Sequence, residues 1–183
     1  MKITNSGVMP YGLAIDSTGA AMVRTAPSGD KFKINTGVIN LTTAGESSIL
    51  YYKHFEDMPL VLDSIVVALE NNSTDVNPTC LFTIVKNPTT GTLISNAAAV
   101  SIKSNCNFGS VNELANSLAY KGAEGYTVTN GDAWDLDFIA SGKNTILLDV
   151  TLNKGNSIAF KIDLQANAAT DLDVYAALNC HFN

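Results

Sequence analysis

Three aspartates lie close together in the chain, at Asp132, Asp135 and Asp137, and grouped carboxylates are typical calcium ligands. The spacing differs from that of an EF-hand loop, which has carboxylates at alternate positions followed by a distal glutamate. Strand alternation also places Asp135 and Asp137 on one face, opposite Trp134. A solvated strand face is therefore favoured over a metal site.

The two histidines, His54 and His181, are the candidates for a catalytic imidazole. The nucleophile pattern G-x-S-x-G is absent, so both are interpreted as surface or interface residues. The segment Asp16-Ser-Thr-Gly19 is similar to the Asp-Thr-Gly of aspartic proteases, but it has an extra residue and no second copy to supply a partner carboxylate. We interpret it as a hairpin turn. The sequence thus predicts that the chain is not an enzyme.

Motifs for cofactors and metals are also missing. The phosphate-binding patterns G-x-x-x-x-G-K and G-x-G-x-x-G do not occur. The cysteines Cys80, Cys106 and Cys180 have no C-x-x-C spacing, so no zinc site and no cofactor are expected. An odd number of cysteines without a signal peptide predicts free, mostly buried thiols in a reducing compartment.

The composition restricts the class of partner. Eleven basic and seventeen acidic residues give a net charge of −6, which disfavours nucleic acid. No apolar run approaches the ~20 residues of a membrane helix, and the N-terminus has no apolar signal region, so we expect a protein made in the cytoplasm. The 183 residues fit one domain.

Alternating apolar residues predict β-strands throughout residues 31–183. Residues 65–69 form an unbroken apolar run, which is typical of a strand buried on both faces. The phase of the alternation changes between Ile34 and Ile39, so Gly37 is a candidate β-bulge.

The strictest alternation lies in four successive C-terminal segments, which begin at Trp134, Ile146, Ile158 and Leu172. Each predicts an antiparallel strand with one face in a core. Eight or more such strands in one domain predict an all-β fold, an antiparallel two-sheet β-sandwich of jelly-roll-like type.

One helix is expected, and its signal is a capping box at Ser110-Val-Asn-Glu113. Helical spacing of Val111, Leu114 and Leu118 supports it. Leu93 with Ile94, and residues 98–102, are expected to form short strands.

Residues 1–30 differ from the rest because glycine and proline interrupt them often and leave only short apolar pieces. We predict an extended N-terminal arm that packs on a neighbour or along a larger surface, followed by a β-sandwich domain over residues 31–183. A disordered tail is the alternative.

Several turns and strand edges carry information beyond the fold. They include Tyr11-Gly-Leu-Ala-Ile-Asp, Phe32-Lys-Ile-Asn-Thr-Gly, Lys86-Asn-Pro-Thr-Thr-Gly and Ala119-Tyr-Lys-Gly-Ala-Glu-Gly. With further short segments they span nearly the whole chain and resemble a family of tailed-bacteriophage virion structural proteins, of head decoration or cement type. The resemblance implies a virion protein that binds the major capsid protein on the outside of the phage head. It also implies a homo-oligomer, often a trimer, that stabilises contacts between capsid subunits.

Under this interpretation the arm contacts the capsid or a neighbouring subunit. The expected arm contacts are Met9, Pro10, Tyr11, Leu13, Ile15, Met22, Val23 and Arg24. Leu147, Tyr175 and Ala177 lie on the outward parity of their strands and are expected to make oligomer contacts.

Two alternatives stay open. One is a tail or baseplate module that binds host-surface glycans through tyrosines, and the available ones are Tyr51, Tyr52, Tyr120, Tyr126 and Tyr175. The other is a free carbohydrate-binding module, which the expected lack of export disfavours.

Overall fold

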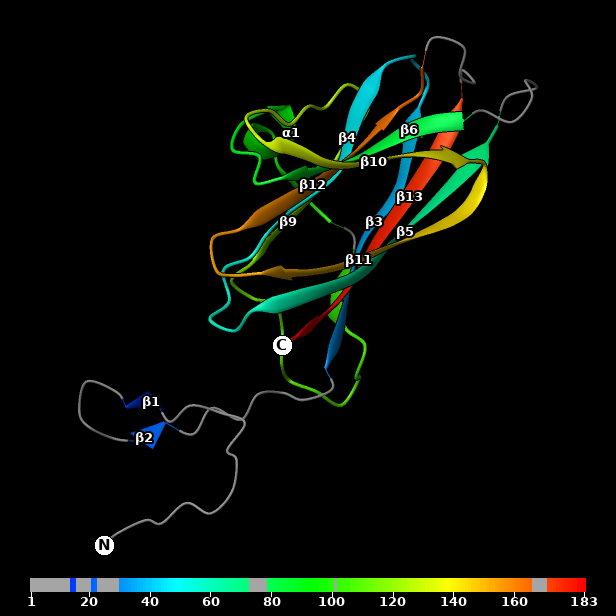
Figure 1. The fold of residues 1–183 in the computed structure, drawn as a ribbon. Coiled ribbons are helices and arrows are strands. Elements are labelled where there is room, and N and C mark those ends of the chain that lie inside the picture. Colours follow the sequence, from blue (N-terminus) through cyan, green and yellow to red (C-terminus); the bar gives the residue numbers. More distant parts are fainter. Residues whose placement is uncertain (1–13, 16–20, 23–29, 73–78, 101, 166–170) are drawn as a thin grey trace, which may run out of the picture.

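The chain folds into two antiparallel β-sheets that pack face to face, which confirms the predicted two-sheet sandwich (Figure 1). The computed structural model describes residues 14–15, 21–22, 30–72, 79–100, 102–165 and 171–183. The five-stranded sheet has the order β11 (Gly142–Leu152), β5 (Leu60–Asn71), β13 (Leu172–Phe182), β3 (Lys31–Leu41) and β8 (Ile102–Asn105). The six-stranded sheet has the order β10 (Asp132–Ala140), β6 (Thr79–Lys86), β12 (Ser157–Asp163), β4 (Glu46–Lys53), β9 (Leu118–Lys121) and β7 (Ala98–Ala99).

Eight of these strands have the pairing of a jelly roll. In chain order they are β3, β4, β5, β6, β10, β11, β12 and β13. The first pairs with the last, the second with the seventh, the third with the sixth and the fourth with the fifth. A long hairpin that folds over on itself produces this pattern. The segment between β6 and β10 adds β7, β8, β9 and the single-turn helix α1 (Thr92–Ser95).

The predicted bulge at Gly37 is confirmed. Asn35 lies opposite Ala177 and Val38 lies opposite Tyr175, so two residues of β3 face one residue of β13. Gly37 has a positive φ of 69°, a conformation in which a side chain would be strained. The bulge returns Ile39 to the core face that Ile34 also occupies.

The prediction that residues 65–69 are buried on both faces is wrong. Ile65, Val67 and Leu69 lie in the core between the sheets, whereas Val66 and Ala68 are half-exposed. β5 is central within its sheet, but a sandwich has only two layers, so the outward face of the strand is not covered by a third.

The predicted helix that begins at Ser110 is also wrong. Residues 110–115 form no regular element, and the short helix α1 lies instead at Thr92–Ser95, where Leu93 and Ile94 were expected in a strand. Leu93 packs there in a small second core with Tyr51, Val85 and Val128, on the outer face of the six-stranded sheet. The short strands predicted near residues 98–102 correspond to β7 and β8.

Strand β10 departs most from its sequence pattern. Trp134, Leu136 and Phe138 were predicted to face the core, but all three are exposed. β10 is the edge strand of its sheet, and a bulge between Ala133 and Asp135 changes the phase of the alternation. Leu136 and Phe138 therefore share the outer face of the sheet with their cross-strand neighbours on β6.

Little of the arm lies within the described residues. β1 (Ala14–Ile15) pairs antiparallel with β2 (Ala21–Met22) as in a hairpin, while the turn predicted at residues 16–19 lies outside the described residues. Ile15 and Met22 belong to this hairpin. The other expected arm contacts, Met9, Pro10, Tyr11, Leu13, Val23 and Arg24, lie outside the described residues.

Candidate interaction surface

A loop over residues 106–117, the 106–117 loop, joins β8 of one sheet to β9 of the other. It carries the two most exposed large apolar side chains of the described chain, Phe108 at 99 % and Val111 at 92 % exposed. Exposed apolar side chains can mark an interaction site, provided that other contacts hold their loop in place.

The carboxylate of Asp30 holds the first half of this loop. Asp30 immediately precedes β3 and is only 5 % exposed. Its oxygens accept hydrogen bonds from Asn107 Nδ2 at 3.2 Å, Ser110 Oγ at 2.7 Å and Asn112 Nδ2 at 2.6 Å. The backbone N–H of Cys106 adds a bond of 2.6 Å to the carbonyl of Lys31. The side-chain donor of Asn112, then that of Ser110, lowers the pKa of Asp30.

These bonds also explain the missing helix. The hydroxyl of Ser110 donates to Asp30, and its oxygen, which a capping box would offer to the backbone N–H three residues later, accepts from a nearer N–H. It accepts a bond from the backbone N–H of Asn112 at 3.1 Å, two residues on, which fixes a turn.

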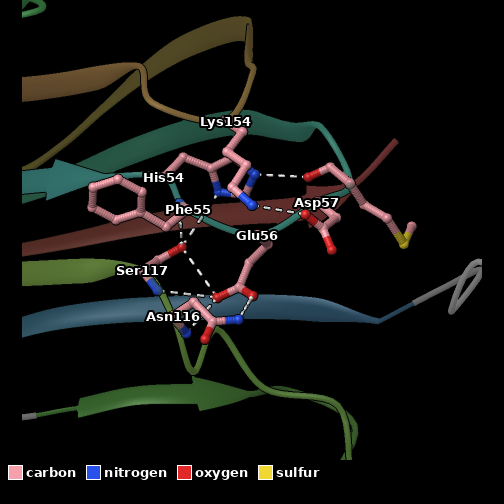
Figure 2. Close-up of polar contacts among 8 residues, drawn as sticks. His54, Phe55, Glu56, Asp57, Asn116, Ser117 and Lys154 are labelled. Atoms are coloured by element: carbon pink, nitrogen blue, oxygen red, sulfur yellow. Dashed lines mark hydrogen bonds and ion pairs between the residues drawn. The ribbon is translucent and has the colours of Figure 1, made fainter. Parts of the chain in front are cut away.

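A second buried carboxylate, Glu56, holds the other end of the loop, as Figure 2 shows. Oε1 accepts bonds from the backbone N–H groups of Asn116 at 2.8 Å and Ser117 at 3.1 Å, and from Ser117 Oγ at 3.2 Å. Oε2 accepts a bond from Asn116 Nδ2 at 2.8 Å. In the part of the loop between these two sets of hydrogen bonds, the side chain of Leu114 is buried in the main core.

His54 lies beside this carboxylate and is fully buried, so the prediction of a surface or interface histidine is wrong for it. Its Nδ1 is 3.1 Å from Tyr52 Oη and 3.5 Å from Ser117 Oγ, and its Nε2 is 2.7 Å from the carbonyl of Met58. Burial lowers the pKa of His54. A histidine near a serine can form a base and nucleophile, but here both side chains are closed off from solvent. The contacts of His54 with Tyr52, Met58 and Ser117 therefore connect β4, the turn before β5 and the 106–117 loop.

The loop is therefore fixed by hydrogen bonds at both ends while its apolar tip stays in water. Fixing a loop in advance lowers the conformational entropy that is lost when a partner binds. Exposed lysines on the neighbouring strands, Lys31, Lys33 and Lys103, lie near the same end of the sandwich. Lys103 Nζ also donates a hydrogen bond of 3.0 Å to the carbonyl of Ser117, at the end of the loop.

The three residues expected to make oligomer contacts differ in how exposed they are. Leu147 is 81 % exposed and is available to a partner. Tyr175 is half-buried, and its hydroxyl is bonded to Asn35 Nδ2. Ala177 is only 1 % exposed, which argues against it as a contact residue. Its small methyl group lies between Val66 and Asn35, the larger side chains opposite it on the adjacent strands.

The other residues singled out by chemistry are dispersed. Asp132, Asp135 and Asp137 are exposed, and no cluster of metal-binding side chains occurs among the described residues. Cys80 and Cys180 are buried free thiols, as predicted, while Cys106 is exposed. Burial raises the pKa of Cys80 to about 11. His181 is on the surface, with Nδ1 2.9 Å from Asp63 Oδ1.

Three of the five tyrosines expected to bind sugars gather at the small second core, on the outer face of the six-stranded sheet. Tyr52 is fully buried, and Tyr51 is largely covered. Tyr51 stacks on the half-exposed Tyr120 with ring centroids 5.9 Å apart. Tyr126 is half-buried against the small second core.

A scan against protein-family models finds no match for the chain, and a search of curated proteins finds no relative. No helix in the described part of the chain is long and apolar enough to cross a membrane.

Proposed function

We propose that this chain is a virion structural protein of the capsid decoration or cement type. It binds the outside of a phage head through its N-terminal arm and the 106–117 loop, and it stabilises contacts between subunits of the major capsid protein. The observation that carries the proposal is the 106–117 loop, where two buried carboxylates hold a loop whose apolar tip is exposed.

Three further features support a protein that functions by binding to a larger partner. The turns and strand edges of the chain resemble those of the phage family named above. The jelly roll is an architecture that viral capsid proteins use, although fold alone does not determine function. Asp30, at the end of the predicted arm, accepts hydrogen bonds from the 106–117 loop, so the end of the arm and the loop meet in space and could contact one partner together.

Cementing has a simple thermodynamic basis. A protein that binds across a boundary between subunits of the assembled shell, and does not bind separated subunits, stabilises the shell by its binding free energy. Copies of the chain that contact each other, with Leu147 as the most exposed candidate, would add to this effect.

The first experiment is to separate purified particles into heads and tails and to measure this chain in each by mass spectrometry. Many copies on heads are expected. Recovery with tails would contradict the head location and favour a tail or baseplate module that binds host-surface glycans. Absence from both would overturn the virion role.

The second experiment compares two deletions in the binding of purified chain to heads that lack it. Removal of residues 1–29 keeps Asp30 and should weaken binding through the arm alone. Removal of residues 1–30 also frees the first half of the loop and should weaken binding further. If neither deletion changes binding, the arm has no part in attachment.

A further inference from the structure

Two hollows open on either side of a ridge at one end of the six-stranded sheet. The first, of about 440 Å³, opens between β10 and β11 and has the indole of Trp134 in its wall. The second, of about 280 Å³, lies over Tyr51 and Tyr120. Asn87, Asn156 and Ser157 line both hollows and form the ridge between them. We call the two hollows and this ridge the ridge groove.

Trp134 owes its place to the bulge in β10. The register of β10 on β6 shifts between Ala133 and Asp135. Trp134 is therefore the extra residue of the bulge and has no residue opposite it on β6. The side chain is 46 % exposed in an open hollow. A half-covered indole offers a flat apolar surface on which the C–H face of a sugar ring can pack.

The ridge supplies hydrogen-bond donors. Asn87 Oδ1 accepts a bond of 2.9 Å from the backbone N–H of Ser157, and Asn156 Oδ1 accepts one of 3.0 Å from that of Asn153. The oxygen of each amide is thus occupied, while neither Nδ2 has a hydrogen-bond partner among the described residues. Asn87 also has a positive φ of 49°, a conformation that asparagine adopts in turns.

The charge of the ridge groove is opposite to that of the whole chain. Lys86 lines the first hollow, Lys53 lines the second with its ammonium group 5.1 Å from the centroid of the Phe55 ring, and no Asp or Glu lines either hollow. Asp132 lies opposite Lys86 on the adjacent strand, but no ion pair joins them in the described chain. In a protein with a net charge of −6, a groove with two lysines and no carboxylate favours an anionic ligand.

We propose that the ridge groove binds an oligosaccharide that contains uronic acid units. One sugar ring packs against Trp134 and another lies beside Tyr120, while the ridge amides donate to hydroxyl groups and the lysines face the carboxylates. This binding activity is separate from the proposed capsid role, because the purified chain should bind the sugar without any capsid present.

The test uses the single tryptophan of the chain as its reporter. Purified protein is titrated with a galacturonic acid oligomer and with a neutral galactose oligomer of the same length, while the fluorescence of Trp134 is followed. The acidic oligomer should bind more tightly and change the emission, and added salt should weaken its binding because the interaction is partly ionic. Equal binding of the neutral oligomer, or no binding of either, would overturn the proposal.

Variants locate the site by calorimetry. Trp134→Ala should weaken binding roughly tenfold or more, as loss of a central aromatic contact does. Lys86→Gln should weaken binding of the acidic oligomer and reduce its salt dependence. Phe138→Ala and Lys143→Gln remove an exposed aromatic and an exposed lysine from the same two edge strands but outside the ridge groove, and both should bind normally. Normal binding by Trp134→Ala, or an equal loss in the two controls, would contradict the assignment.

Discussion

The 106–117 loop and strand β10 both expose large apolar side chains, but they are held in place by different means. The loop depends on two single carboxylates, Asp30 and Glu56, which together accept seven hydrogen bonds. β10 depends on its backbone pairing with β6 along nearly its whole length. One changed side chain can therefore release one end of the loop, whereas no single side chain of β10 determines the position of that strand.

The largest effect is expected from Glu56→Ala. The backbone N–H groups of Asn116 and Ser117 lose their acceptor, and the Ser117 N–H is buried, which should lower the free energy of unfolding by about 3 kcal/mol. Urea unfolding measures this change. Glu113→Ala, an exposed glutamate of the same loop, is the matched control and should stay within about 0.5 kcal/mol of the wild type. Similar stabilities of the two variants would show that Glu56 does not hold the loop.

A smaller and pH-dependent effect is expected from His54. Because burial lowers its pKa in the folded chain below the ordinary value of 6.5, the unfolded chain binds the proton more readily. The contribution of neutral His54 to the free energy of unfolding should therefore be fully present above pH 6.5. It should fall as the pH drops below 6.5, by at most about 1.4 kcal/mol per pH unit. His54→Gln should lack this slope, and the surface variant His181→Gln should keep it. Unfolding curves over this pH range decide between the outcomes.

A local effect is expected at Asp30. Since its pKa lies below the ordinary 3.8, its carboxylate stabilises the loop at all pH values above 3.8, and this stabilisation is lost as the pH falls through the lowered pKa. The side-chain amide resonances of Asn107 and Asn112 should report the release by NMR. In Asp30→Ala these resonances should be those of a released loop already at neutral pH, while Asp132→Asn on β10 should behave as the wild type. An unchanged titration in Asp30→Ala would exclude this role for the carboxylate.

The smallest effect is expected on β10. Leu136→Ser and Phe138→Ser alter side chains that are mostly in water, so each should change the free energy of unfolding by no more than about 0.5 kcal/mol. A loss near that of Glu56→Ala, seen in the same urea series, would mean that these side chains hold β10 in place and would remove the distinction between the two regions.

The sequence predicts well those features that local alternation controls. The strand pattern and the two-sheet class follow from period-two alternation, and the bulge at Gly37 follows from a change of phase. The edge position of β10 could not be predicted in this way, because alternation does not say which strand lies outermost in a sheet. Its exposed apolar residues consequently resemble a core-facing row in the sequence.

The anchoring of the 106–117 loop was missed for a related reason. Asp30 and Glu56 lie far from their partners in the sequence, and a lone acidic residue beside a strand carries no recognisable signal. The local capping pattern at Ser110 predicted a helix, but the Ser110 side chain donates to the distant Asp30 and accepts from the N–H two residues on, which forms a turn. The one available signal was the density of asparagine and serine over residues 104–117, which exceeds what an ordinary connection needs.

The central claim is that the exposed tip of the anchored loop binds the partner. The most direct test adds the purified double variant Phe108→Ser/Val111→Ser to phage heads that lack this chain and measures how much stays bound. Both side chains are in water in the free chain, so its stability should not change, while retention on heads should fall by roughly tenfold or more. Retention equal to that of the wild type would contradict the claim.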